Sequence, residues 1–343
     1  MSVAMKPGLV SVVVTSYNHA GFLERRMDSL ISQTYQDIEI LVIDDCSTEN
    51  NVEILRRYES HPKIQLLLRK QNGGVVSATN QGIEMSSGEF VIIAQCDDDC
   101  DPRMIERLVG ALKSHPTAGI AFCRSQLVDQ NDQVIGDDYS TRERSFRKRC
   151  TTDVVVRGAE MSRFLLHSCV IPNMSALLMR RDCLAAVGAL SGAYAVCWDW
   201  ELFFRVAARY DVSYVAEPLN RFRQHKNTIR SVTKNRVIYG EMFRLLLGQS
   251  KALDLTLIER CRFRTRIMFL WAVHLISPSW SGLKNFPYHA SLVFRYDSLA
   301  LLFLWLGLVL RATQVLGKLV LGRQRLPALP HPRARRSHTA GLR

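Results

Sequence analysis

The chain has 343 residues, of which 47% are hydrophobic, and a formal net charge of +13. This length exceeds that of one typical domain, and the apolar content is enough for a sizeable core, so one large α/β domain with an appendage is expected. The nine cysteines lack the spacing of a disulfide framework or a structural zinc site, which favours a reducing, cytosolic compartment.

Short apolar runs alternate with amphipathic segments along the first hundred residues. The expected strands are continuous apolar runs of the kind buried in a parallel sheet, at residues 10–15, 38–43, 64–68 and 90–94. The expected helices between them are residues 20–33, 51–60 and 75–86. Strands that alternate with helices predict right-handed crossovers and a doubly wound α/β sheet.

Polar clusters follow three of the expected strands, at residues 15–18 (TSYN), 44–47 (DDCS) and 97–99 (DDD). Ligands of doubly wound sheets bind at the carboxyl ends of the strands. If the strands are neighbours, the three clusters line one crevice that offers an aromatic ring, hydrogen-bonding groups and carboxylates. Such a crevice suits a nucleoside diphosphate, which has a ring to stack, donors to pair and charge to neutralise.

The three consecutive aspartates, residues 97–99, lie between Cys96 and Cys100. Carboxylates packed this closely raise one another's pKa, so a counter-ion is expected. The candidates are a divalent metal, a cluster of arginine or lysine, or the water around an exposed turn. The spacing of the cysteines gives poor support for zinc, whereas oxygen ligands favour Mg²⁺ or Mn²⁺.

Several segments together resemble the family 2 glycosyltransferases with a GT-A fold, over roughly residues 9–230. They are the opening SVVVTSYNHAGFLERRMDSLISQTYQDIEILVIDDCS, an NGG loop, a GEF strand, the acidic cluster before Pro102, WDWELFFR and RFRQHKNT. The resemblance implies a GT-A, Rossmann-like, mostly parallel sheet flanked by helices. It also implies inverting transfer of a sugar from a nucleoside diphosphate donor.

The resemblance carries donor-binding roles to residues at the first strand ends and in the glycine loop. Thr15 and Tyr17 are implied to flank the nucleobase, and Asp45 to hydrogen-bond it. A carboxylate at this place accepts from a ring N–H and so selects a base. The other residues implied for the nucleotide sugar are Asn18, Gly73, Gly74, Gln95 and Asp97.

The acidic cluster resembles the DxD region of that family, with one departure. Asp97 and Asp98 fill its closing positions and are the expected metal ligands, while Gln95 occupies the earlier position and adds no charge. Asp99 lies outside the pattern and is expected to face solvent. The resemblance adds His225 near the metal or diphosphate. Mg²⁺ or Mn²⁺ would stabilise the charge of the leaving nucleotide, and the carboxylates would then need no other counter-ion.

Inverting displacement needs a general base, and the resemblance places it at Asp199, early in an expected helix over residues 198–209. Glu201 is the reserve candidate. Trp198 and Trp200 either stack on acceptor sugars or pack in the core. The Gln-x-x-Arg-Trp motif of the processive synthases is not found, so addition of a single sugar is expected.

The C-terminal part is basic and apolar: residues 241–343 carry 16 basic and 4 acidic groups. Residues 241–276 are expected to be helical, and residues 298–310 are an uncharged run too short to span a bilayer. Cations beside apolar helices favour an anionic membrane surface over nucleic acid, for which no motif is found. The alternative is a soluble helical subdomain or a homodimer interface.

The expected organisation is a catalytic domain over residues 1–240, a helical extension over 241–322 and a disordered basic tail over 323–343. No signal peptide is expected, so the enzyme is placed at the cytoplasmic face of the membrane, acting on a saccharide or lipid-linked acceptor. Two other functions stay open. A sugar nucleotidyltransferase would be expected to carry a basic glycine-rich loop after the first strand, and a non-catalytic scaffold is hinted at by Gln95.

Overall fold

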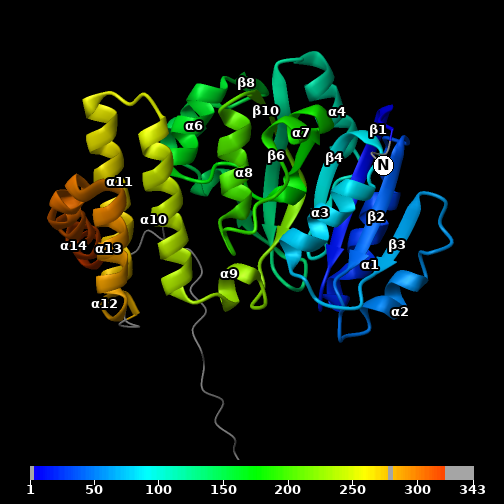
Figure 1. Ribbon diagram of the computed structural model, residues 1–343, viewed down its shortest axis with the longest axis horizontal. Helices are drawn as coiled ribbons and strands as arrows, with labels where there is room; N and C mark the ends of the chain where they lie inside the picture. Colours follow the sequence, from blue (N-terminus) through cyan, green and yellow to red (C-terminus); the bar gives the residue numbers. More distant parts are fainter. Residues whose placement is uncertain (1–3, 277–280, 321–343) are drawn as a thin grey trace, which may run out of the picture.

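The computed structural model describes residues 4–276 and 281–320 (Figure 1). Its N-terminal half alternates strands and helices as expected, since β-branched runs form the strands and amphipathic segments cover them. These elements are β1 (Lys6–Ser16), α1 (Ala20–Ile31), β2 (Ile38–Asp44), α2 (Asn51–Arg56), β3 (Ile64–Leu68), α3 (Val75–Met85) and β4 (Gly88–Gln95).

The second half of the sheet domain is more irregular. Its strands are β5 (Asp99–Cys100), β6 (Ala118–Val128), β7 (Val134–Asp137), β8 (Val154–Val156), β9 (Leu177–Arg180) and β10 (Asp211–Arg223). Its helices are α4 (Met104–Ser114), α5 (Arg144–Arg149), α6 (Gly158–His167), α7 (Arg181–Val187), α8 (Trp198–Ala207) and α9 (Ile229–Val232).

The strands form one mixed sheet in the order β3-β2-β1-β4-β9-β6-β10-β5. Strands β1 to β4 pair in parallel, as predicted, and so do β6 and β10. The short strand β9 runs antiparallel to both β4 and β6 and joins the two parallel parts. The α/β class is therefore confirmed, and the sheet is mixed beyond its N-terminal half.

Strand register brings the predicted polar clusters to one edge of the sheet. Thr15 at the end of β1 pairs with Ile43 of β2 on one side and with Gln95 of β4 on the other. The segments 15–18, 44–47 and 95–99 therefore leave the sheet side by side. The expectation that the three clusters lie at the ends of neighbouring strands is confirmed.

The first strands are buried on both faces, which explains their unbroken apolar sequence. In β1, Val12 and Val14 pack with Leu23 of α1, whereas Val13 points to the opposite face and packs with Ala78 of α3. Gly82 of α3 lies so close to β1 that an added Cβ would approach a methyl group of Val13 to 2.3 Å. Helix α3 is thus held tightly against the sheet, directly behind the strand ends.

The C-terminal helices pack at the end of the molecule away from β3 (Figure 1). They are α10 (Asn235–Ala252), α11 (Leu257–Leu275), α12 (Ser281–Lys284), α13 (Phe286–Asp297) and α14 (Leu304–Val320), with a 3₁₀ turn (Ser298–Phe303) before α14. Phe243 and Trp271 are fully buried in the same apolar cluster as Phe164 of the sheet domain. The extension therefore shares a core with the α6–α8 side of that domain.

The C-terminal region differs from the sequence expectation in how its helices are divided. The helix expected over residues 241–276 is two helices, because a capping box at Thr256 starts α11 after a break. Among the described residues, one helical stretch, Phe286–Val315, is long and apolar enough to cross a membrane by length and composition alone, which is a weak indication. The tail expected to be disordered, residues 323–343, lies outside the described residues.

Candidate functional site

The end of β1 presents one exposed aromatic ring at the polar edge of the sheet. Tyr17 is 43% exposed, whereas Thr15 beside it is buried. Asn18 has a left-handed backbone, with φ of +51°, and its Oδ1 accepts a hydrogen bond from the N–H of Thr48 at 2.8 Å. Asn18 thus links the end of β1 to the loop after β2 through this hydrogen bond. The neighbouring Tyr17 has its ring exposed and available to a ligand.

Asp45 organises the glycine loop that sequence analysis assigned to the donor. Its carboxylate accepts hydrogen bonds from the N–H groups of Gly73 and Gly74, at 2.9 and 2.8 Å, and from Nη1 of Arg69 at 2.7 Å. Gly74 has a φ of +82°, which favours glycine, and a Cβ at Gly73 would lie 2.6 Å from the Arg69 guanidinium. The structure therefore brings Asp45, Gly73 and Gly74 together, with three of the roughly four acceptor positions of the carboxylate occupied.

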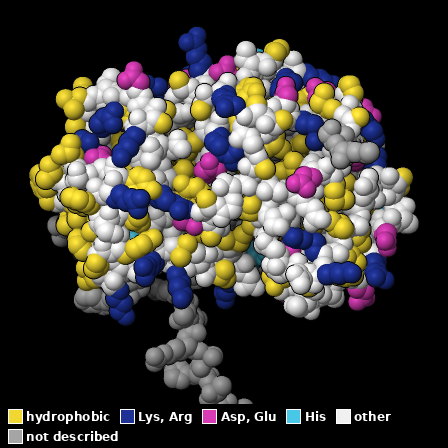
Figure 2. Space-filling view, viewed as in Figure 1, with side chains coloured by type: hydrophobic (Ala, Val, Ile, Leu, Met, Phe, Trp, Pro, Cys, Tyr) yellow, Lys and Arg dark blue, Asp and Glu magenta, His cyan; other side chains and the backbone are white. Residues whose placement is uncertain are grey.

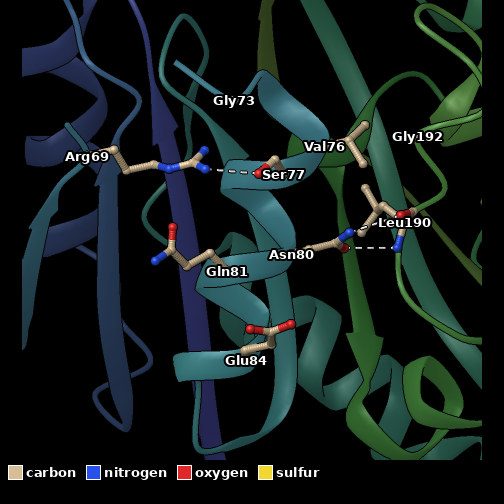
Figure 3. A pocket seen from close by; sticks show the side chains of 9 residues that line it. All are labelled: Arg69, Gly73, Val76, Ser77, Asn80, Gln81, Glu84, Leu190 and Gly192. Carbon is tan, nitrogen blue, oxygen red and sulfur yellow. Dashed lines mark hydrogen bonds between the residues drawn. The ribbon is translucent and has the colours of Figure 1, made fainter. Parts of the chain in front are cut away.

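A pocket of about 600 Å³ lies beside this assembly, between α3 and the segment that contains Leu190 (Figure 3). Arg69 reaches from Asp45 to the hydroxyl of Ser77 on α3. On the far side of α3, the Asn80 side chain donates to the carbonyl of Leu190 and accepts from its N–H, both at 3.0 Å. The pocket therefore has a rigid wall and continues from the glycine loop.

The three consecutive aspartates point to three different sets of partners. Asp98 is 1% exposed and accepts from the Asn173 amide at 2.7 Å and from the N–H of Arg223 at 3.0 Å. Burial, followed by the charge of Asp97, raises the pKa of Asp98 to about 7. Asp99 forms an ion pair with Arg223 at 3.0 Å and is 4% exposed. The expectation that Asp99 faces solvent is wrong, because β5 pairs with β10 and turns it inward.

Arg223 is the main counter-ion of this run. Its side chain is 2% exposed, its Nε donates to the carbonyl of Asp97 at 2.8 Å, and its guanidinium lies over the Phe22 ring at 5.0 Å. The same guanidinium bonds Asp99 and, at 2.6 Å, Asp132. The expectation that a metal alone would balance the acidic run is therefore wrong: a buried arginine, contributed by β10, neutralises part of it.

Asp97 is the carboxylate of the run that faces histidines. Its Oδ2 lies 3.0 Å from Nε2 of His225, and the possible ligand atoms of His19, Asp97 and His225 all lie within 4.8 Å of one another. Burial alone would raise the pKa of Asp97, but the hydrogen bond from His225 and the charge of His19 hold it below its ordinary value. Imidazole nitrogens and a carboxylate fit a divalent cation, and Asp98 is not part of this group.

His19 is the residue of this group that sequence analysis did not select. It directly follows Asn18, in the loop that leaves β1, and precedes the first residue of α1. Burial lowers its pKa, which favours the neutral, ligand form of the ring. The sequence signal available for His19 was its position one residue after the first polar cluster. A single histidine between a strand and a helix is not distinctive, however, unless it is known that the end of β10 lies beside it.

Asp199 lies in the first turn of α8 and is half-buried. Its Oδ1 accepts from the N–H of Trp200 at 2.7 Å, yet burial outweighs this bond and raises the pKa of Asp199. Trp198 and Trp200 are 3% and 7% exposed, and the Trp200 indole donates to the carbonyl of Leu165. These tryptophans pack in the core, which was one of the two expected roles. Glu201, the reserve base, is paired with Arg205 at 2.9 Å.

Comparison with known proteins identifies the chain's relatives. Residues 11–166 match the family model described as glycosyl transferase family 2. A chondroitin synthase of Pasteurella multocida is 27% identical over 154 residues, which are 45% of this chain and 16% of that protein. The chain thus spans about one sixth of the length of that relative.

Two solved structures share the fold. The S. aureus TarS fragment 1–349, in complex with UDP-GlcNAc, has a TM-score of 0.64 and 16% identity, and the match covers 86% of this chain and 83% of that one. The mannosyltransferase PcManGT of Pyrobaculum calidifontis, in complex with GDP-Man and Mn²⁺, has a TM-score of 0.51 and 18% identity over 92% of this chain and 89% of that one. Residues 11–166 are therefore similar to glycosyl transferase family 2, and the two solved structures show that the chain shares their fold.

Proposed function

We propose that the protein is an inverting glycosyltransferase that moves a single sugar from a nucleoside diphosphate sugar to a saccharide or lipid-linked acceptor. The observation that carries the proposal is the meeting of three strand ends at one edge of the sheet, which places Tyr17, Asp45 and Asp97 in the segments that follow neighbouring strands. Solved structures of similar fold hold UDP-GlcNAc or GDP-Man. UDP and dTDP sugars are the favoured donors.

The donor would lie along this edge. The exposed ring of Tyr17 is available to stack on the base, with Thr15 beside it. The remaining acceptor position of Asp45 would take a ring N–H, with Arg69 holding the carboxylate in place. Asn18, Gly73 and Gly74 shape the walls around the nucleotide, and the amide of Gln95 would meet a ribose or sugar hydroxyl.

Asp97 and His225 would hold a divalent cation, Mg²⁺ or Mn²⁺, which when bound neutralises charge on the leaving diphosphate. Both side chains are already hydrogen-bonded to each other, and Asp97 keeps 16% of its side chain exposed. Asp98, the third expected ligand, is instead directed towards Asn173 and the Arg223 backbone and lies outside the group of His19, Asp97 and His225.

Asp199 would take the proton from the acceptor hydroxyl as that oxygen attacks the anomeric carbon. The bond from the anomeric carbon to the diphosphate oxygen breaks on the opposite side, so the configuration inverts. A carboxylate with a raised pKa is a stronger base than an exposed aspartate, which suits this role. Its position in the first turn of a packed helix fixes the direction in which it acts.

The donor site is tested by calorimetric titration with UDP, dTDP and GDP, each in Mn²⁺ and in EDTA. We expect metal-dependent binding of one nucleotide that is lost in Asp97→Asn and kept in Asp101→Asn, a neighbouring carboxylate paired with Arg103. NMR of the product's anomeric proton then reports transfer and its stereochemistry. Absence of binding to all three by the folded protein would refute the proposal, and binding without turnover towards any acceptor would favour a scaffold.

The second part of the proposal places the enzyme on an anionic membrane surface at the cytoplasmic face. Hydrophobic side chains gather at the end of the molecule where α13 and α14 lie, with Lys and Arg around them (Figure 2). Phe294, Leu302 and Trp305 are each 65–66% exposed. An apolar groove of about 880 Å³ runs between α11 and α14, with Arg262 at its edge. Exposed apolar and cationic groups together match anionic lipid.

Vesicle sedimentation tests this surface. Binding to vesicles that contain phosphatidylglycerol, but not to phosphatidylcholine alone, is expected to weaken in the Leu302→Ser, Trp305→Ser double variant. The Val134→Ser variant, which changes an apolar side chain on β7 that is 58% exposed, is the control. Equal binding by all variants would refute the membrane role. Sedimentation velocity without lipid would show a dimer if the surface instead joins two copies.

A further inference from the structure

His19 lies with Asp97 and His225, the two residues proposed above to hold the cation, in one group of possible metal ligands. We propose that these three side chains form a two-histidine, one-carboxylate metal site that binds its ion before the nucleotide and selects a transition-metal dication over Mg²⁺. The inference deepens the proposed metal-assisted transfer. It rests on that function only for the identity of the group that binds to the ion afterwards, the diphosphate of the donor.

The three ligands come from three separate parts of the chain. His19 lies in the loop between β1 and α1, Asp97 in the turn after β4, and His225 just beyond β10. All three ligand atoms lie within 4.8 Å of one another, and Asp97 Oδ2 and His225 Nε2 are 3.0 Å apart. Two ligands at right angles, each about 2.1 Å from an ion, are about 3 Å apart. The pair therefore has the spacing of neighbouring ligands on one ion.

The two histidines are in contact with groups behind them. The N–H of Asn227 donates to Nδ1 of His225 at 3.3 Å, so the other nitrogen of that ring faces Asp97. An Nδ1 that accepts a hydrogen bond leaves the ring proton on Nε2, which donates it to Asp97, so binding an ion through Nε2 would require that proton to leave Nε2. Nδ1 of His19 contacts the Cys96 thiol at 3.5 Å, and the Phe22 ring lies 5.0 Å from that of His225 and 6.2 Å from that of His19. The site is thus held in place without an ion.

The donor set decides which ion is preferred. Mg²⁺ takes oxygen ligands, keeps several waters and is held by one or two carboxylates together with substrate phosphates. Two imidazoles and one carboxylate instead favour transition metals, with affinity rising from Mn²⁺ towards Co²⁺ and Zn²⁺. Three protein ligands also leave open positions on the ion for diphosphate oxygens. The ion therefore needs no nucleotide to complete its binding, unlike a site with a single carboxylate.

The neighbouring aspartates do not compete for this ion. Asp98 is bonded to Asn173 and to the Arg223 backbone, and Asp99 is paired with the Arg223 side chain. Asp97 is left facing the two histidines. The site consequently carries one carboxylate charge, and its affinity for a transition metal rests on the imidazoles.

The test titrates the nucleotide-free, full-length protein with MnCl₂ and follows free Mn²⁺ by electron paramagnetic resonance. We expect one bound Mn²⁺, an affinity at least tenfold higher than for MgCl₂ in competition, and a loss of at least tenfold in His19→Gln and in His225→Gln. His115→Gln changes an exposed histidine on the surface and is expected to bind Mn²⁺ like the wild type. Circular dichroism checks that each variant is folded.

A second measurement uses the wild-type protein and needs no variant to fold. Bound Mn²⁺ is expected to broaden the imidazole proton resonances of His19 and His225 at substoichiometric metal, while the His115 resonance stays sharp. Unchanged affinity in His19→Gln, or a sharp His19 signal in the Mn²⁺-loaded protein, would overturn the inference, as would equal affinity for Mg²⁺.

The outcomes separate the inference from the proposed function. Metal that binds only after UDP or dTDP is added, with normal transfer, would refute the three-ligand site and leave the glycosyltransferase proposal standing. Tight Mn²⁺ binding through both histidines, with no nucleotide binding and no transfer, would support the site and refute the proposed function.

Discussion

Replacing Arg223 by methionine tests whether an arginine, rather than a metal, balances the acidic run. The Arg223 and Asp99 side chains are 2% and 6% exposed and their charged groups are 3.0 Å apart. Removing one partner of a buried pair typically costs about 3–5 kcal/mol, because the other charge stays buried without compensation. Among the described residues, Asp99 would keep one cationic partner, Arg221, at 3.5 Å. We therefore expect Arg223→Met to lower the free energy of unfolding by about 4 kcal/mol.

Urea unfolding in EDTA measures this cost, with Arg103→Met as the matched control. Arg103 is 55% exposed and pairs with Asp101 at 3.2 Å, so its loss should cost less than about 1 kcal/mol. The Arg223→Met, Asp99→Asn double variant should recover part of the loss, since neither charge is then left unpaired. A loss below 1 kcal/mol for Arg223→Met, strict additivity in the double variant, or wild-type protein that unfolds when EDTA is added would refute the reasoning.

Three further predictions concern single carboxylates. Asp199→Asn should lower kcat by about 10²–10⁴-fold and leave nucleotide affinity within twofold, as measured by steady-state kinetics and calorimetry; a proportional loss of affinity would contradict the role of base. Asp45→Ala leaves the N–H groups of Gly73 and Gly74 without their acceptor, so it should weaken nucleotide binding at least tenfold and cost about 2–3 kcal/mol in urea unfolding. Asp98 has a pKa near 7 in the folded protein against 3.8 for an ordinary aspartate, so the folded state holds the extra proton between these values. The stability that protonated Asp98 contributes is therefore present in full below about pH 4 and is lost as the pH rises through 7. The fall in unfolding free energy between pH 5 and pH 8 in EDTA should be smaller in Asp98→Asn, and an equal fall would show that another group titrates.

The sequence predicts the parts of this site that depend on local pattern. Buried strands show as apolar runs, and the polar residues that follow them, such as Thr15 and Asp45, must lie where those strands leave the sheet. The environment of Asp99 could not be predicted in this way. It depends on the pairing of a two-residue strand with β10, more than a hundred residues later, which sequence periodicity does not encode. The same long-range pairing explains why His19 was missed.

The packing of the C-terminal helices illustrates a second limit of sequence patterns. An apolar residue in an amphipathic helix is equally consistent with a protein core and with a lipid surface, and only tertiary contacts separate the two. Trp271 is fully buried beside Phe243, whereas Trp305 is 65% exposed, although both occur in similarly apolar and basic segments. Identical residue types in one extension therefore have different roles, one in folding and one available for binding.

The division of the acidic run has a consequence for the charge of the proposed active site. Two of the three carboxylates are satisfied by protein groups, and Asp97 is left facing two imidazoles. With a divalent ion and neutral histidines, the site proposed above would carry a net charge of about +1, whereas an ion held by two carboxylates would be neutral. A positive site stabilises the negative charge that grows on a leaving diphosphate, and it does so most strongly where water is excluded. Pairing Asp99 with the Arg223 guanidinium would therefore serve catalysis as well as folding, because it keeps the charge of Asp99 from cancelling that of the ion.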